Sequence, residues 1–305
     1  PFVERMKEEL LSLHVTQADE TPTQVIQDSS RPNSKCYMWV HRSGEFYSER
    51  PIVIYEYQKG RDHQKPLSFY KDYKGILVTD GLQQYHLVDK KLPGVTNANC
   101  WAHARRDFAD AVKAMDKKDP SAVRNSVAYV ALQKIGEFYN ADTELKGLSS
   151  EERLQKRQET IQPLVEDFFA WVKEQISQCT VPPKSKTGQG LQYLIHQETY
   201  LKVFLTDGDV PIDNSASERS IRTFCIGKKN WMFHNTANGA SASAMVYSIS
   251  ETAKLNDLRP YYYFRYILTE LPKRSDENGN IDPSKLDDLM PWSSALPDEC
   301  RKLRR

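Results

Sequence analysis

The chain has 305 residues, of which 39% are hydrophobic and 27% are charged, and its formal net charge is +1. This length and hydrophobic content are sufficient for the core of one large domain or two ordinary ones, so we expect a soluble globular protein. The small net charge excludes a nucleic-acid binder that is basic over its whole surface, although it allows a local basic stripe.

Apolar runs, the first residues and the cysteines indicate the cellular compartment that we expect for the protein. No run of about 18 apolar residues occurs, so no membrane span is expected, and the first residues lack a signal-peptide pattern. The five cysteines are scattered and form no CxxC pair, which is typical of reduced thiols in a cytosolic protein. Because the chain does not begin with Met, we expect it to be a fragment with a segment missing before Pro1.

The first hundred residues predict strands joined by turns, followed by alternating helices and strands. Strands are predicted over residues 11–19, 36–42, 51–58, 75–81 and 94–103, and helices over 63–75 and 82–88. This order specifies a mixed sheet whose first three strands meander, with helices packed on it through crossovers. The predicted fold class is therefore α/β.

The pattern changes to helix over residues 104–205. Helices are predicted over 104–115, 122–142, 149–177 and 190–205, with a loop over 179–190 before the last of them. We interpret this block as an all-helical insertion that serves packing or partner contacts. Helices over 239–258 and 259–272 follow, and residues 273–305 are polar and Pro-rich, which predicts an extended tail.

Carboxylates at the ends of predicted strands are candidates for a metal site. Asp19 and Asp80 each end a strand, and strand ends are where ligands gather in α/β sheets. A third acid from a later helix, Glu218 or Asp213, would complete a set of oxygen ligands for Mg²⁺. The alternative is structural, since Asp80-Gly81 is a common turn dipeptide and Asp213 is a plausible helix N-cap.

The helix that carries Glu218 also carries basic residues suited to flanking phosphates. Glu218 and Arg222 are four residues apart and share a face, which in isolation indicates only an exposed ion pair. Trp231 could stack on a base or sugar, or be buried. Other basic clusters are Arg105-Arg106 and the tail 301–305. The candidate phosphate ligands on this helix are Arg219, Arg222, Lys228 and Lys229.

Six segments that span nearly the whole chain carry a resemblance to a known family. They are ADETPTQV, GILVTDGLQQY, CWAHARRDF, VPIDNSASERSIRTFCIGKKNWMF, GASASAMVYSISETAKLNDLRPYYYFRYIL and a late stretch ending in Trp292. In this order they resemble the catalytic region of bacterial transposases of the insertion sequence 66 family. The resemblance implies a ribonuclease-H-like fold with a DDE triad, in which the helical block precedes the helix that bears the glutamate.

Carried over residue by residue, the triad falls on Asp19, Asp80 and Glu218, which by resemblance are the catalytic residues and the metal ligands. The family pattern is closer to DNNxxERAIRP, and the chain departs from it at Ser215, Ser220 and Thr223. None of these departures removes an acid. Family members usually carry an N-terminal zinc-binding and DNA-recognition region, which we expect to be absent from this fragment.

The resemblance also implies domain limits and partners. The catalytic core would comprise residues 1–103 and 210–272, interrupted by the helical insertion 104–209 and followed by the tail 273–305. With Mg²⁺ or Mn²⁺, the domain would cleave transposon ends and transfer the freed strand into target DNA. The expected partners are terminal inverted repeats, target DNA, a second copy on DNA and accessory transposition proteins, in the bacterial cytoplasm at the nucleoid and without a membrane.

The segment CWAHARR supplies further DNA-positioning candidates, which are His103, Arg105 and Arg106. Cys100 and His103 could also be considered as a metal pair, but CxxH has no further ligands nearby. Two alternative functions stay open at this point. One is a metal-dependent nuclease or resolvase on the same fold, and the other is a non-catalytic DNA-binding protein derived from a transposase.

Overall fold

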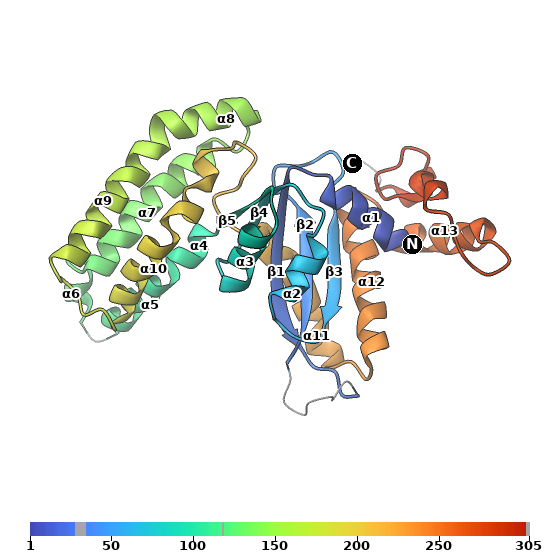
Figure 1. Cartoon of the computed structure of the whole chain (residues 1–305), viewed down its shortest axis with the longest axis horizontal. Helices are drawn as coiled ribbons and strands as arrows, with labels where there is room; N and C mark the ends of the chain where they lie inside the picture. The colour runs from blue at the N-terminus through green and yellow to red at the C-terminus, as the bar shows by residue number, and fades with distance from the viewer. Residues whose placement is uncertain (28–34, 118, 303–305) are drawn as a thin grey trace. The chain divides into compact units, whose positions relative to one another are not determined.

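The computed structural model describes residues 1–27, 35–117 and 119–302. Two compact units make up the chain (Figure 1). Unit 1 comprises Pro1–Leu77, Leu87–Val95 and Ala216–Arg305, and unit 2 comprises Val78–His86 and Thr96–Ser215. The domain limits expected from the sequence stay a prediction, as does the interpretation of the helical block as an insertion.

Within the described residues, five strands form a mixed sheet in the order β3-β2-β1-β4-β5. β1 pairs antiparallel with β2, and β2 pairs antiparallel with β3, which confirms the predicted meander. The α/β class and the mixed sheet are therefore as expected, while the ribonuclease-H-like assignment stays a prediction. The strands are β1 (Val15–Thr23), β2 (Cys36–Ser43), β3 (Val53–Gln58), β4 (Gly75–Thr79) and β5 (Val95–Asn99).

Predicted strand limits differ from the structure: residues 11–14 precede β1, Asp80 and Gly81 follow β4, and the ends predicted for β1 and β5 are wrong. β1 continues past Asp19 because Thr21 and Thr23 still pair with residues of β2, so Asp19 lies within the strand and not at its end. β5 ends at Asn99, and the residues from Trp101 to Ala104 form the short helix α4. The predicted strand up to residue 103 had counted this helix as extended chain.

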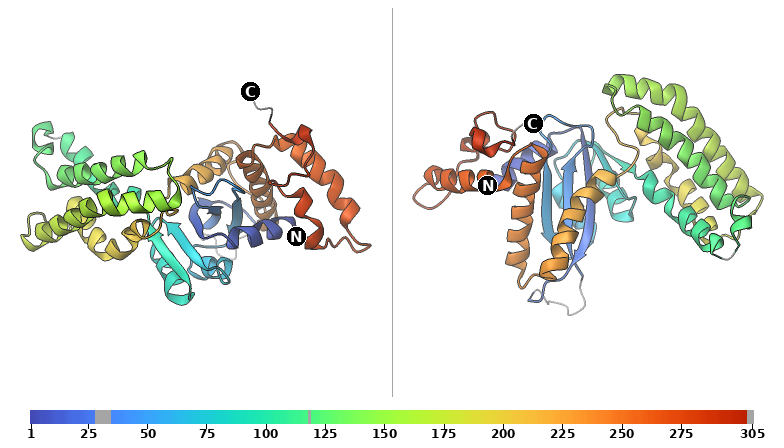
Figure 2. Two further views of the ribbon diagram at one scale, coloured as in Figure 1. Left: turned by 90° about the horizontal axis from the view of Figure 1, so that it is seen from above. Right: turned by 180° about the vertical axis from the view of Figure 1, so that it is seen from behind.

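Unit 1 has helices on both sides of its strands (Figures 1 and 2). α1 (Phe2–Leu11) and α2 (Gln64–Phe69) lie on one side, and α11 (Ser215–Trp231) lies on the other. No element had been predicted over α1, although its buried residues Phe2, Met6 and Leu10 recur at intervals of one helical turn. α3 (Gln83–Lys91) follows β4, as predicted.

α12 (Ala237–Leu255) covers the outer edge of the sheet at β3. The Ser248 hydroxyl accepts a hydrogen bond from the Tyr55 backbone N–H at 2.8 Å, and the Thr252 hydroxyl accepts one from the Val53 N–H at 3.0 Å. The Thr252 hydroxyl also donates to the Val53 carbonyl at 2.9 Å. An exposed strand edge can pair with a strand of another chain. Here the two hydroxyls bond to backbone groups at the edge of β3 instead.

The C-terminal part of unit 1 is more ordered than an extended tail. α13 (Pro260–Arg274) includes two residues that had been placed in the tail. Three 3₁₀ turns follow, and Leu286, Leu289 and Met290 are fully buried among them. The turns are η3 (Pro283–Lys285), η4 (Asp287–Leu289) and η5 (Asp298–Cys300).

The described residues of unit 2 between Trp101 and Leu205 are mostly helical around a core of aromatic rings, and the predicted helical block begins at residue 104. Trp101 packs against Phe138 with ring centroids 4.7 Å apart, and Phe168 and Phe169 lie about the same indole. The helices are α4 (Trp101–Ala104), α5 (Arg106–Asp116), α6 (Pro120–Val123), α7 (Val127–Glu144), α8 (Ser150–Lys156), α9 (Gln162–Ser177) and α10 (Lys186–Leu201), with the 3₁₀ turn η2 (Val203–Leu205).

Three details of these helices differ from expectation. The helix predicted over 122–142 is broken, because the Ser126 side chain accepts from the Tyr129 N–H and starts α7. The helix predicted over 149–177 contains a π-helical turn, η1 (Arg157–Ile161). α10 begins at Lys186, within the predicted loop, because Ser185 caps the Gly188 N–H at 3.0 Å.

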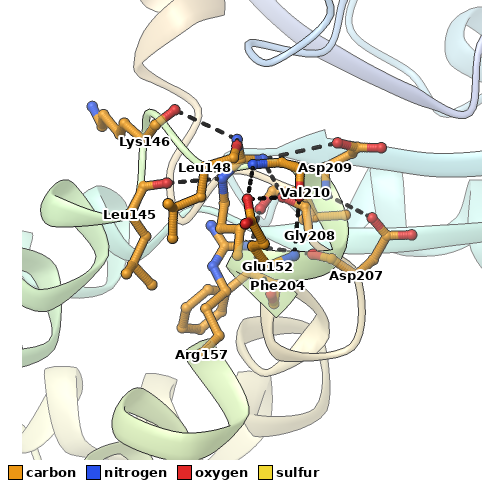
Figure 3. A network of polar contacts seen from close by, with 12 residues as sticks. Leu145, Lys146, Leu148, Glu152, Arg157, Phe204, Asp207, Gly208, Asp209 and Val210 are labelled. Atoms are coloured by element: carbon orange, nitrogen blue, oxygen red, sulfur yellow. Dashed lines mark hydrogen bonds and ion pairs between the residues drawn. The ribbon is translucent and has the colours of Figure 1, made fainter. Parts of the chain in front are cut away.

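A buried arginine in the π-helical turn holds the segment that leads to α11 (Figure 3). Arg157 forms a 2.7 Å ion pair with Asp142 of α7, and both side chains are buried. The same guanidinium donates to the carbonyls of Phe204, Asp207 and Val210 at 2.9, 3.1 and 2.8 Å. The chain between η2 and α11 is therefore held to the helices of unit 2 by Arg157 together with Arg153, which donates to the Gly208 carbonyl at 2.6 Å.

No helix of the described residues is both long and apolar enough to cross a membrane.

Candidate functional site

Asp19 and Glu218 lie on the same side of the sheet in unit 1. The Thr21 hydroxyl contacts the Cys225 sulfur of α11 at 3.6 Å, and strand alternation places Asp19 on the same face as Thr21. Asp19 is paired across the strands with Val40, which packs in one cluster with Phe224 of α11. Glu218 is in the first turn of this helix. β1 thus presents its aspartate on the face that α11 covers.

Arg42 of β2 fixes the start of α11 against the sheet. Its guanidinium donates to the Ala216 carbonyl at 3.0 Å and is buried, with 8% of the residue exposed. Burial lowers the pKa of Arg42 to about 10, so the side chain stays charged at neutral pH. One turn further on, the Tyr55 hydroxyl donates to the Ser220 carbonyl at 2.7 Å. These bonds hold the backbone on both sides of Glu218.

Asp213 has the structural role that the capping pattern suggested. Its carboxylate accepts a hydrogen bond at 2.8 Å from the N–H of Ser215, the first residue of α11. The neighbouring Asn214 is fully buried, and its N–H donates to the Cys100 sulfur at 3.1 Å. Asp213 therefore satisfies a backbone N–H at the start of the helix, which is a structural role.

Asp80 belongs to unit 2 and directly follows β4, whereas the predicted strand includes it. Its carboxylate accepts from the Leu82 N–H at 3.1 Å, which closes a tight turn over Gly81. Gly81 has a φ of +84°, a conformation that favours glycine. The turn interpretation of Asp-Gly is thus correct, and it sets the carboxylate at the end of the strand.

The segment after β5 places three DNA-positioning candidates in unit 2. Arg105 and Arg106 are exposed where α4 gives way to α5. His103 is half-buried, and burial followed by the nearby Arg106 charge lowers its pKa to about 4, although Asp213 opposes the shift. His103 is therefore neutral at pH 7, while the two arginines supply positive charge.

The basic residues of α11 belong to unit 1 and differ in their surroundings. Arg222 and Lys229 are exposed. Arg219 is also exposed but forms a 2.8 Å ion pair with Glu45, and the Lys228 ammonium donates to the Pro22 carbonyl at 2.6 Å. Of the basic tail 301–305, residues 303–305 lie outside the described part of the chain.

Trp231 at the end of α11 packs within unit 1. Its ring centroid lies 5.2 Å from that of Phe224 and 4.4 Å from that of His234. The indole is half-buried beside the cluster that joins α11 to the sheet. A packing role for Trp231 is thus present, and stacking on DNA stays a prediction.

The expected ligands have the donor chemistry of a magnesium or manganese site. Asp19, Asp80 and Glu218 offer carboxylate oxygens only, which hard divalent cations prefer over thiolates or imidazoles. Across residues 1–27, 35–117 and 119–302, no three carboxylate, imidazole or thiol groups lie close enough together to hold a metal ion. Asp19 and Glu218 belong to unit 1 and Asp80 to unit 2, so the metal site stays a prediction.

Sequence reasoning missed the residues that support these acids. Arg42 was passed over within an apolar strand, although a charge in such a strand is itself a signal of a buried polar contact. Asn97 and Asn99 of β5 are buried and hydrogen-bonded behind Asp80, and an Asn-x-Asn pair in a short strand is a comparable signal. Gln197 of α10 accepts a 2.8 Å hydrogen bond from the Asn99 side chain, and nothing in the sequence around Gln197 indicates this contact.

Comparison with known proteins agrees with the resemblance. The family model described as "Transposase IS66 family" matches residues 1–242, and that of the "IS66 C-terminal element" matches residues 248–292. Two uncharacterized proteins of Sinorhizobium fredii, y4hP and y4qI, are 29% and 28% identical to the chain, over 79% and 90% of its length. The matches cover 44% and 50% of those proteins, so the chain spans about half the length of the curated relatives it matches.

The first of these models alone matches well over half of the chain, and the second continues the match through α13 and into the C-terminal turns. The candidate acids Asp19, Asp80 and Glu218 all fall within the first match. The chain therefore belongs to the IS66 family of transposases.

Proposed function

We propose that this chain is the catalytic region of a DDE transposase that cleaves transposon ends and joins them to target DNA. The observation that carries the proposal is the packing of α11 on the face of β1 that holds Asp19, in a chain of a transposase family. The sheet order supports a ribonuclease-H-like core, in which β1 and β4 are neighbours, β1 carries Asp19 and Asp80 directly follows β4.

In this proposal, Asp19, Asp80 and Glu218 hold one or two divalent cations, Mg²⁺ or Mn²⁺. When bound, the cations supply an activated water or hydroxyl and stabilise the leaving oxygen of the phosphodiester. The bonds from Arg42 and Tyr55 keep Glu218 oriented when DNA and its charge approach. Arg105, Arg106, Arg222 and Lys229 are exposed, and they hold the flanking phosphates.

Cleavage and strand transfer are both in-line displacements at phosphorus, so one set of carboxylates serves both. Water attacks in the first step and the freed 3′-hydroxyl in the second. We further propose that the partners are terminal inverted repeats, target DNA and a second copy on DNA, with accessory transposition proteins, at the bacterial nucleoid. Pairing two element ends would bring two copies of the chain together on DNA, so the proposal includes a dimer or higher oligomer.

The proposal is tested by incubating the chain with labelled DNA that carries the terminal repeats flanking its gene, with Mg²⁺, Mn²⁺ or EDTA. Joined products that require metal would support transposition. Nicks without joining would favour a nuclease or resolvase. DNA binding without any metal-dependent product would identify a non-catalytic relative.

The variant Asp80→Asn makes the test specific. We expect it to lose all metal-dependent product while binding DNA as well as the parent or better, because the substitution removes both a metal ligand and a negative charge that repels phosphate. Cleavage at the parental rate by Asp80→Asn would show that the site has been assigned to the wrong residues.

A further inference from the structure

We propose that α10 is a positioning element for Asp80, acting through a buried chain of amides that ends at Gln197. The inference rests on the proposed catalytic role of Asp80. In this proposal, the helical region helps to position a catalytic residue, which is a role beyond packing. All the residues involved belong to unit 2.

A continuous run of hydrogen bonds leads from the turn at Asp80 to α10. The Gly81 N–H donates to the Thr79 hydroxyl at 3.4 Å, and this hydroxyl donates to Asn97 Oδ1 at 3.2 Å. Asn97 Nδ2 then donates to Asn99 Oδ1 at 2.8 Å. Asn99 Nδ2 donates to Gln197 Oε1, also at 2.8 Å. The two residues on either side of Asp80 are thus connected to a helix more than a hundred residues later.

The three central members of this hydrogen-bond network are buried, and Gln197 at its end is half-buried. Thr79 and Asn97 are 0% exposed and Asn99 is 3% exposed. Without Gln197, the Asn99 amide would keep a buried donor with no acceptor, and such groups are costly. Nε2 of His86 donates to Asn99 Oδ1 at 3.2 Å, and its ring stacks on Tyr200 of α10 with centroids 4.1 Å apart. α10 therefore supports this network at two positions.

The turn itself is held closely against the same helix. A Cβ atom added to Gly81 would lie 2.5 Å from the Tyr193 hydroxyl of α10 and 2.9 Å from Asn99 Nδ2. The Tyr193 hydroxyl also donates to the Asp80 carbonyl at 3.4 Å. Because the backbone on both sides of Asp80 is confined in this way, its carboxylate has a restricted set of directions.

The test uses near-isosteric substitutions of Gln197 in the full 305-residue chain. Gln197→Met removes the acceptor and keeps the volume, whereas Gln197→Glu keeps an acceptor oxygen. Gln189→Met is the matched control, because Gln189 is an exposed glutamine of α10 that bonds to the Lys184 carbonyl instead. The Mn²⁺ concentration that gives half-maximal DNA cleavage is measured for each chain.

We expect Gln197→Met to raise this Mn²⁺ concentration by about 10-fold or more, as substitutions behind metal ligands do. Gln197→Glu and Gln189→Met should stay near the parental value. Equal Mn²⁺ dependence in Gln197→Met and the parent would overturn the inference. If Gln197→Met fails to fold, Tyr193→Phe takes its place, with a smaller shift in the same direction expected.

A second readout does not depend on activity. Hydrogen exchange of the peptide containing Thr79 to Leu82 should be faster in Gln197→Met than in the parent or in Gln189→Met, since the Gly81 and Leu82 N–H groups lie in the constrained turn. Unchanged exchange would also contradict the inference. Activity that survives in Asp80→Asn would instead defeat the proposed function, so the two failures are distinguishable.

Discussion

Arg157 and Asp142 form an ion pair with 2.7 Å between Nε and Oδ1, and their side chains are 0% and 2% exposed. The pair joins the π-helical turn η1 to α7 inside unit 2. Arg157 also donates to three backbone carbonyls of the segment that precedes α11 (Figure 3). We expect the pair to stabilise unit 2, because either charge would be unfavourable if it were buried without its partner.

We expect Arg157→Met to lower the free energy of unfolding by about 3–5 kcal/mol, because Asp142 would keep a buried charge without its partner. Urea unfolding followed by far-ultraviolet circular dichroism measures the change. Lys156→Met is the matched control: Lys156 is next in the chain and exposed, and its solvent-screened pair with Glu159 contributes little to stability. Equal losses in the two variants would mean that the buried pair does not stabilise the fold.

His103 predicts a specific dependence of stability on pH. Its pKa is about 4 in the folded chain and about 6.5 when unfolded, so between these values the unfolded chain binds a proton that the folded chain does not. The free energy of unfolding should therefore fall as the pH is lowered from 6.5 towards 4. In His103→Gln, the free energy of unfolding should fall less steeply with decreasing pH than in the parent, over roughly the upper half of that pH interval. Identical slopes in the two chains there would contradict the assignment.

The exposed cations predict how DNA binding responds to salt. Replacing Arg222 or Lys229 by alanine should weaken binding to all sequences alike and reduce the slope of log K against log salt by about 1 for each phosphate that the variant no longer neutralises. Fluorescence anisotropy at several salt concentrations measures the slope. Lys273→Ala is the control, since Lys273 on α13 is exposed and paired with Glu270. An unchanged slope in both Arg222→Ala and Lys229→Ala would show that these two side chains do not neutralise DNA phosphates.

Most elements could be predicted from the sequence because their periodicity is local. The meander of β1 to β3 and the helices of unit 2 follow from alternating and helical patterns of apolar residues. The end of β1 could not be predicted, because it is set by the length of β2: Cys36 still pairs with Thr23. The π-helical turn η1 likewise depends on the burial of Arg157 among distant carbonyls.

For the candidate site, the sequence indicated the acids but not their supports. Asp80 and Asp213 were readable because turns and caps have local signatures. Arg42 reaches Ala216 across 174 positions, and Asn99 reaches Gln197 across 98. Contacts over such separations depend on how strands and helices pack, so a single sequence carries little trace of them.

We expect Glu218, and not Asp213 just before α11, to be the catalytic acid of this segment. Strand transfer of labelled element ends with Mn²⁺ should be compared for the parent, Glu218→Gln and Asp213→Asn, with DNA binding measured for each. Asparagine caps a helix about as well as aspartate, so Asp213→Asn should keep joining DNA. Glu218→Gln should bind DNA and form no joined product. Joining at the parental rate by Glu218→Gln would show that Glu218 is not the catalytic acid.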